Sequence, residues 1–162
     1  MLKRRLSYAQ GYLELGMVAE AAAELEKIPP AEAGALEVVA LRLAVLQEQK
    51  NWPAVSALAN DLVRRHPSEA AGWVTWAYST RRADSLLAAE KILLEAEQHH
   101  PDEPTIQFNL GCYAAQRGDL VVARARVNRA IALDPKFAVA AATDPDLAPL
   151  RAADATDCQP AP

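Results

Sequence analysis

The sequence contains few cysteines and no long hydrophobic run, and both absences restrict where the protein works. Only Cys112 and Cys158 are present, the first inside an expected helix and the second near the C-terminus. Two cysteines so placed do not form a disulfide framework, so we expect free thiols in a reducing compartment and a cytoplasmic protein. No segment approaches the roughly 18–20 apolar residues of a membrane span, and no apolar stretch of signal-peptide length follows the basic N-terminus.

Aromatic residues are also scarce, at 6% of the chain, although hydrophobic residues make up 51% of it. The apolar content is therefore mainly alanine, leucine and valine. Alanine and leucine favour helices, and small side chains allow helices to pack closely. The composition indicates a helical protein of 162 residues, which is long enough to bury a substantial core.

An excess of basic residues is missing as well. Lys and Arg number 17 against 21 for Asp and Glu, which gives a formal net charge of −4 at pH 7. A mildly acidic chain does not create the positive field that attracts nucleic-acid phosphates or anionic lipid surfaces. We therefore expect no nucleic acid and no membrane among its partners.

Patterns typical of catalysis and of metal or cofactor binding do not occur. The sequence has no glycine-rich phosphate loop and no nucleophile elbow. His99 and His100 are adjacent but lack a cysteine or carboxylate cluster at ligand spacing, and a position near a helix C-terminus explains them better than a metal. Nothing near Cys112 would lower its pKa and make it a nucleophile. We expect no catalytic residue, no cofactor and no metal site.

The sequence does contain a repeat, because four columns of residues recur every 34 positions. The columns are Pro67, Pro101 and Pro135; Ala21, Val55, Ala89 and Ala123; Ile28, Leu62, Ala96 and Ala130; and Ala9, Leu43, Ala77 and Gly111. Units of this length are typical of helix pairs that stack side by side, each burying its apolar face against its neighbours. The period predicts a solenoid with a binding surface rather than a catalytic pocket.

The last unit shows how one repeat is expected to fold. Ile106 and Leu110 lie on one face of its first helix by their i, i+4 spacing. Gly118 ends that helix in the left-handed conformation, and Asp119 is placed to cap the second helix. Pro135 then prevents the second helix from continuing.

This unit resembles a tetratricopeptide repeat (TPR), a family whose units combine small and large residues at fixed offsets. The matching residues are Leu110, Gly111, Ala123, Ala130 and Pro135, and in the preceding unit Trp73, Ala77, Ala89, Leu93, Ala96 and Pro101. Gln107, Ala114 and Val127 depart from the pattern at positions where bulky aromatic residues are usual. The resemblance extends through about Arg151, where an Asp-Pro-Asp-Leu segment follows the last repeat.

The resemblance implies an all-α, right-handed superhelical solenoid of about four helix-turn-helix repeats with a C-terminal capping helix. We expect one repeat domain over residues 1–151, followed by a disordered tail over residues 152–162 that has no pattern. The expected divisions are repeats at 2–30, 36–69, 70–103 and 104–137, and a capping segment at 138–151.

Two of the repeats depart from strict periodicity. In the second repeat the strict register would place Arg42 inside, whereas a shift of one residue turns Leu43 and Ala44 inward and indicates a one-residue deletion near residues 47–51. In the third repeat Asp84 replaces the turn glycine, which predicts a left-handed backbone at Asp84, a conformation that aspartate accepts better than most residues.

In the TPR family the first helix of each repeat lines a concave groove. The family's groove positions and their neighbours give a mainly apolar surface with two arginines. The candidate partner-binding residues are Leu41, Val45, Val74, Tyr78, Arg81, Arg82, Phe108, Cys112 and Gln116. A continuous exposed apolar stripe usually marks a contact site. Two alternatives stay open: the groove of so short a stack closes on itself, or the C-terminal tail, residues 152–162, fills it.

The expected function is non-catalytic. We expect a protein–protein interaction scaffold or adaptor in a bacterial cytoplasm, with a peptide or partner helix bound in the groove. The Lys–Asn pairs with which some family members hold a C-terminal carboxylate are missing at the matching positions, such as Leu6, Gln10 and Thr75. Two other functions stay open: a chaperone that holds a secreted or assembly partner, and a self-assembling structural subunit that forms a homodimer.

Overall fold

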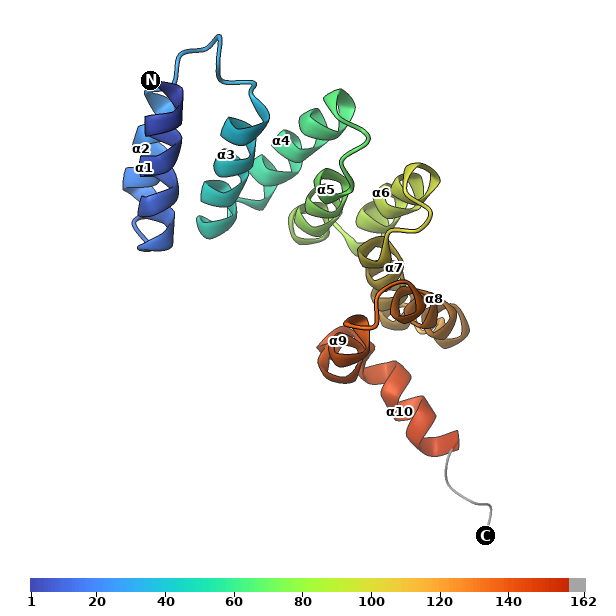
Figure 1. Ribbon diagram of the computed structural model, residues 1–162. Helices are drawn as coiled ribbons and strands as arrows, with labels where there is room; N and C mark the ends of the chain where they lie inside the picture. The colour runs from blue at the N-terminus through green and yellow to red at the C-terminus, as the bar shows by residue number, and fades with distance from the viewer. Residues whose placement is uncertain (158–162) are drawn as a thin grey trace.

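The computed structural model describes residues 1–157 and consists there of α-helices, one short 3-10 helix (η1) and turns. The first eight helices form four consecutive pairs: α1 (Leu2–Glu14) with α2 (Val18–Glu26), α3 (Leu36–Glu48) with α4 (Trp52–Arg65), α5 (Ala70–Ala83) with α6 (Leu86–His99), and α7 (Pro104–Gln116) with α8 (Leu120–Leu133). Figure 1 shows these pairs following one another along a curved row. The expected all-helical solenoid is confirmed.

The C-terminal segment folds against the last helix pair. It comprises α9 (Phe137–Thr143), η1 (Pro145–Leu147) and α10 (Ala148–Asp157), which contact α7 and α8 (Figure 1). The sequence predicted disorder from Ala152 onward, and for residues 152–157 this was wrong. Arg124 of α8 pairs with Asp154 of α10, and alanine favours helix in this segment. The rest of the expected tail, residues 158–162, lies outside the described part of the chain.

Three different backbone solutions connect the helices within the repeats. Gly118 has the left-handed φ of 83° that the sequence predicted for the last turn. In the second repeat Lys50 takes the same role with φ of 53°, which is uncommon for a residue with a side chain. The prediction for Asp84 was wrong, because its φ is −133°. Ser85 follows it and caps α6 with its side chain, so this turn needs no left-handed residue.

The apolar repeat columns are buried apart from half-buried Leu62, whereas the prolines at the repeat ends are exposed. Ala21, Val55, Ala89 and Ala123 have no exposed surface, and each lies in the second helix of its pair. Small residues at these points allow the two helices of a pair to approach closely. The approach is close at Gly111 in α7, where an added Cβ would lie 2.8 Å from Cγ2 of Val127 in α8.

The apolar core is divided into three adjoining clusters instead of one centre. An N-terminal cluster joins α1, α2 and part of α3, a middle cluster joins the rest of α3 to α4, and a larger C-terminal cluster extends from α4 to α10. Trp76 of α5 contacts both the middle and the C-terminal cluster. Each helix pair therefore completes its core with side chains of the next pair, as expected for a solenoid.

Helix α3 divides its apolar side chains between two of these clusters. Val38 and Val45 pack in the N-terminal cluster, whereas Val39 and Leu43 pack in the middle one. The one-residue shift that the sequence indicated was wrong, because α3 and α4 begin at residues 36 and 52, 34 positions before α5 and α6 begin at 70 and 86. Leu43 is buried at the position equivalent to Ala77, and Arg42 is half-buried at a surface hollow. Helix α3 therefore keeps the 34-residue register of the other first helices, and this matters for the groove.

Candidate functional site: the concave groove

The C-terminal segment fills the groove at the fourth repeat. The ring of Phe137 in α9 lies 5.0 Å from the ring of Phe108 in α7, and Leu147 of η1 is only 1% exposed. Phe108 and Cys112, both expected on the groove surface, are buried beneath this segment. Residues 137–147 therefore cover this part of the groove, and Phe108 and Cys112 are not exposed contact residues.

Polar contacts fasten the same segment to the groove. Arg81 of α5 forms two hydrogen bonds with the carboxylate of Asp146, one of them 3.0 Å long between Nη2 and Oδ1. Gln116 Nε2 donates to the backbone oxygen of Asp146 at 2.8 Å, and the Asp144 carboxylate accepts from the Asp146 N–H at 2.8 Å. The hydrogen bonds with Asp146 raise the pKa of Arg81 further above its ordinary value. Arg81 and Gln116, both predicted as partner contacts, bind the chain's own C-terminal segment.

Two titratable groups lie under the C-terminal segment. Burial raises the pKa of Cys112 to about 12, with the nearby carboxylates of Asp144 and Asp146 adding to the effect. Burial likewise raises the pKa of Tyr113 to about 12. Both groups are therefore neutral at physiological pH, and the Cys112 thiol lacks the anionic form that a nucleophile requires.

The N-terminal part of the expected stripe also differs from the prediction. Val45 is buried, and Leu41 is half-buried against the same N-terminal cluster, so neither faces α5. The strict register explains this difference, because it places Ala40, Ala44 and Gln47, and not Leu41 and Val45, at the groove positions of α3. The expected stripe from Leu41 to Phe108 is therefore interrupted at both ends, and Val74 and Tyr78 are its accessible apolar part.

A hollow of about 400 Å³ surrounds these two residues where α3 and α4 face α5. Tyr78 is 42% exposed and Val74 is half-buried. The other lining residues come from the end of α3, the start of α4 and α5: Gln47, Glu48, Trp52 and Thr75. Trp52 lies outside the groove positions expected from the sequence. Its position directly after the Lys50 turn was the signal that could have placed it there.

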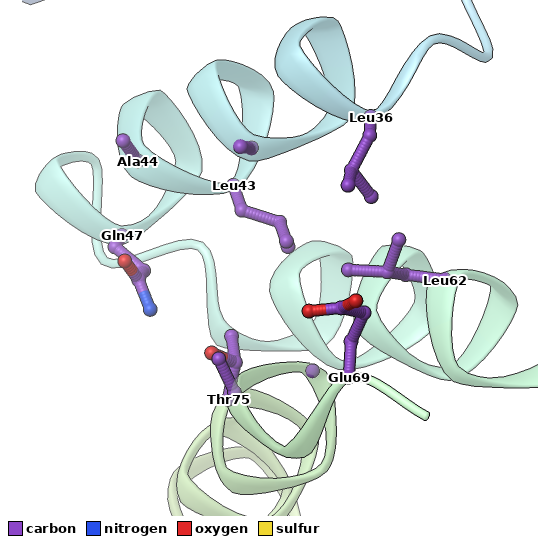
Figure 2. A pocket seen from close by; sticks show the side chains of 10 residues that line it. Leu36, Leu43, Ala44, Gln47, Leu62, Glu69 and Thr75 are labelled. Atoms are coloured by element: carbon purple, nitrogen blue, oxygen red, sulfur yellow. The ribbon is translucent and has the colours of Figure 1, made fainter. Parts of the chain in front are cut away.

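A second hollow, of about 280 Å³, opens between α3 and α5 and shares Gln47 and Thr75 with the first (Figure 2). Figure 2 shows Leu36, Leu43 and Leu62 converging on it from α3 and α4, with Glu69 beside them. Leu36 is 43% exposed although it is the first residue of a helix with a largely buried face. The two hollows form one mainly apolar surface, which we call the α3–α5 surface. Sequence reasoning missed Leu36 and Leu62 because they lie outside the family's groove positions.

Arg82 lies beside the α3–α5 surface in an aromatic setting. Its guanidinium carbon is 3.5 Å from the ring centre of Tyr78 and 5.1 Å from that of Trp52. The two rings are themselves 5.7 Å apart in an edge-to-face arrangement. Stacking of this kind restrains the guanidinium and leaves its N–H edge available to a ligand. Arg82 also lines a hollow of about 480 Å³ that continues from Tyr78 to Asp146.

The histidines have structural contacts. The ring of His99 stacks on Trp73 with ring centres 5.4 Å apart, and His100 Nε2 lies 2.9 Å from the backbone oxygen of Pro67. Trp73 Nε1 donates to the same oxygen at 2.9 Å. Neither histidine borders the α3–α5 surface.

In residues 1–157, no helix has both the length and the apolar content that crossing a membrane would require.

Stacked helix pairs of a 34-residue period, with the first helix of each pair on the concave side, define this chain as a TPR-like α-solenoid. Several solved structures share the fold. A thermophilic TPR protein of Thermus thermophilus, TTC0263, matches with a TM-score of 0.70 and 18% identity over 95% of this chain and 83% of its own. The protein described as "MamA RS-1 ArsTM double mutant" matches with a TM-score of 0.70 and 15% identity over 83% and 75%.

The third structure, "MamA MSR-1 C2", matches with a TM-score of 0.59 and 15% identity over 96% of this chain and 95% of its own. No protein-family model matches the sequence, and the comparison with curated proteins finds no match. At 15–18% identity these likenesses establish the fold. The function has to be argued from the surface itself.

Proposed function

We propose that this chain is a non-catalytic protein–protein interaction module, a scaffold or adaptor that binds an extended or helical segment of a partner on the α3–α5 surface. The module comprises the four repeats and the capping segment, residues 1–151. The observation that carries the proposal is the pair of adjoining apolar hollows on the concave side, at the part of the groove that the C-terminal segment leaves open. A partner segment would enter along α3 and α5, with Val74 and Tyr78 as its central contacts.

Three properties of the surface support this function. Leu36 and Tyr78 are large side chains that stay about two-fifths exposed beside a hollow, where a partner would remove them from water. Tyrosine and arginine are among the residues that contribute most to protein interfaces, and Tyr78 and Arg82 are in contact here. The buried thiol of Cys112 is free and neutral, which suits a reducing cytoplasm and gives no support to a nucleophilic enzyme.

The experiment selects peptides from a random dodecamer library displayed on phage, with the full chain immobilised. We expect selected peptides to bind wild type and to lose about tenfold in affinity on Tyr78→Ala, because truncating a central tyrosine contact typically costs more than 1 kcal/mol. Leu87→Ala is the matched control, since Leu87 is an exposed apolar residue of the second helix α6. Thermal unfolding of each variant verifies that it is folded.

The outcomes separate the candidate functions. Peptides whose affinity does not respond to Tyr78→Ala, or a library that gives no binder, would contradict the proposal. Light scattering of the full chain at high concentration addresses the other candidates: a stable homodimer that competes with the selected peptides would make the chain a self-assembling subunit instead. A chaperone for an assembly partner would bind through the same surface, and would differ by keeping an aggregation-prone client soluble.

A further inference from the structure

Arg81 and Arg82 are neighbours in sequence but differ in their partners. The carboxylate of Asp146 satisfies Arg81 with two hydrogen bonds. Arg82 has no ion pair with any acidic residue in the described part of the chain, and its recorded hydrogen bond is a long one of 3.4 Å to the backbone oxygen of Tyr78. The groove therefore contains one arginine that already binds a carboxylate and a second one that is exposed and restrained by aromatic rings.

The chain's own segment shows what such an arginine binds in this groove. Asp146 gives its carboxylate to Arg81, and the next residue, Leu147, inserts an apolar side chain that is almost completely buried. An acidic residue directly followed by an apolar one thus pairs with the arginine and fills the apolar part of the groove beside it. Arg82 offers the same pair of features, because the exposed ring of Tyr78 and the hollow beside Val74 adjoin its guanidinium.

The charges around Arg82 limit the ligand further. Glu48 lines the hollow on one side of Tyr78, and Asp144 and Asp146 line the hollow on the other side. Asp146 forms an ion pair with Arg81, and the Asp144 carboxylate accepts a hydrogen bond from the Asp146 N–H. Both carboxylates nevertheless carry negative charge on the C-terminal side of Arg82. A run of several carboxylates would be repelled by these groups at close range. A single carboxylate opposite Arg82 is compatible with them.

We infer that Arg82 is the anchor for one aspartate or glutamate of the partner segment, with an apolar residue directly after it packed on Tyr78 and Val74. This inference rests on the proposed function, and it names the ligand class of the same surface. The stacked guanidinium presents its N–H edge to the carboxylate in the two-pronged geometry that Arg81 adopts with Asp146. The apolar residue enters the hollow of about 400 Å³.

The test repeats the dodecamer selection on three full-length proteins: wild type, Arg82→Gln, and Arg64→Gln as a control for an exposed arginine of α4. Wild type and Arg64→Gln are expected to enrich peptides in which Asp or Glu precedes Leu, Ile, Val or Phe. Arg82→Gln is expected to lose this enrichment. A selected peptide is then synthesised in its acidic form and with the carboxylate replaced by the amide.

Fluorescence anisotropy measures the affinity of both peptides for wild type and Arg82→Gln. We expect the amide peptide to bind wild type about tenfold more weakly, as for loss of a hydrogen bond to a charged group, and the two peptides to bind Arg82→Gln equally. Peptides that depend on Tyr78 but show no carboxylate preference, or that bind Arg82→Gln unchanged, would overturn the inference and leave the proposed function intact. Peptides that ignore Tyr78→Ala would overturn both.

Discussion

Arg81 and Asp146 are 65 residues apart in sequence and form a two-pronged ion pair across the concave face, between the third repeat and the C-terminal segment. This pair spans the fourth repeat, whose first helix α7 lies between its two ends along the stack. Phe108 and Cys112 of α7 are buried where the segment crosses. A contact made after the last repeat thus determines which part of the groove is left for a partner.

Asp146→Asn tests how firmly this contact holds the segment. We expect hydrogen exchange of residues 137–147 to accelerate and the free energy of unfolding to fall by roughly 1 kcal/mol, because a partly buried, hydrogen-bonded charge pair is lost. Asp61→Asn is the control: Asp61 pairs with Arg65 on the exposed face of α4, and such pairs contribute little. Unchanged exchange over residues 137–147 would show that the apolar contacts alone hold the segment.

Gly111→Ala tests the close approach of α7 and α8. The new Cβ would lie 2.8 Å from Cγ2 of Val127 and 3.3 Å from the backbone oxygen of Ala123, so one helix has to shift. We expect a loss of about 1–3 kcal/mol in urea unfolding, as for overpacked cores. Gly11→Ala is the matched control in α1, where nothing lies within 4 Å of the added Cβ, and it should stabilise by about 0.5–1 kcal/mol. Equal effects of the two substitutions would contradict the close packing.

Cys112 should be unreactive in the folded protein. With its pKa raised to about 12 and its side chain buried, the thiol is neutral and inaccessible at pH 8. Labelling with a maleimide or disulfide reagent in a Cys158→Ser background is expected to be slow in buffer and complete in denaturant. Because the buried thiol reacts only in locally opened molecules, raising the pH from 7 to 9 should increase the labelling rate of the native protein by the same factor as that of the denatured protein. Rapid native labelling at pH 8 would contradict the burial.

The acid stability of the fold should depend on Glu97. Hydrogen bonds from Arg126 hold the pKa of Glu97 below its ordinary value, against the opposing effect of burial. The stabilisation is therefore fully present above the unfolded pKa of about 4.3 and is lost as the pH falls through the lower folded value. Glu97→Gln should flatten the fall of unfolding free energy below pH 5. Glu95→Gln, an exposed neighbour on α6, should leave this fall as in wild type.

The same network explains a residue that the sequence marked only as unusual. Gln107 departs from the bulky aromatic residue typical of its position, and it is completely buried. Its amide donates to Glu97 at 2.8 Å and accepts from Arg126 at 2.7 Å, so both of its polar atoms are satisfied. The partners lie in α6 and α8, and nothing in the 34-residue period indicates that these three side chains meet.

The fold was predictable because apolar residues 34 positions apart occupy equivalent buried places in successive helix pairs. The column of Ala21, Val55, Ala89 and Ala123 could be read from spacing alone, and all four are fully buried. The groove was less predictable, because its exposed part depends on contacts that do not repeat. The ring of Phe137 covers Phe108, whereas Val45 was expected in the groove only because α3 was shifted by one residue from its true register.

The turns show the same limit on a smaller scale. Gly118 follows a rule that sequence can apply, since glycine adopts positive φ without strain. Lys50 adopts positive φ without this advantage, because the chain has to reverse there between two packed helices. Asp84 avoids positive φ because Ser85 supplies a cap directly after it. Each choice depends on the geometry of the neighbouring helices.

The attachment of the C-terminal segment to two different repeats has a practical consequence for engineering longer versions of this protein. A repeat grafted after α8 would displace α9 and η1 and expose the side chains beneath them. Duplicating residues 70–103 in front of α7 avoids this, since the copied unit brings its own counterpart of Arg81 into the place where Asp146 needs it. Such an array would gain repeats in its interior and keep the C-terminal segment docked on the last repeat.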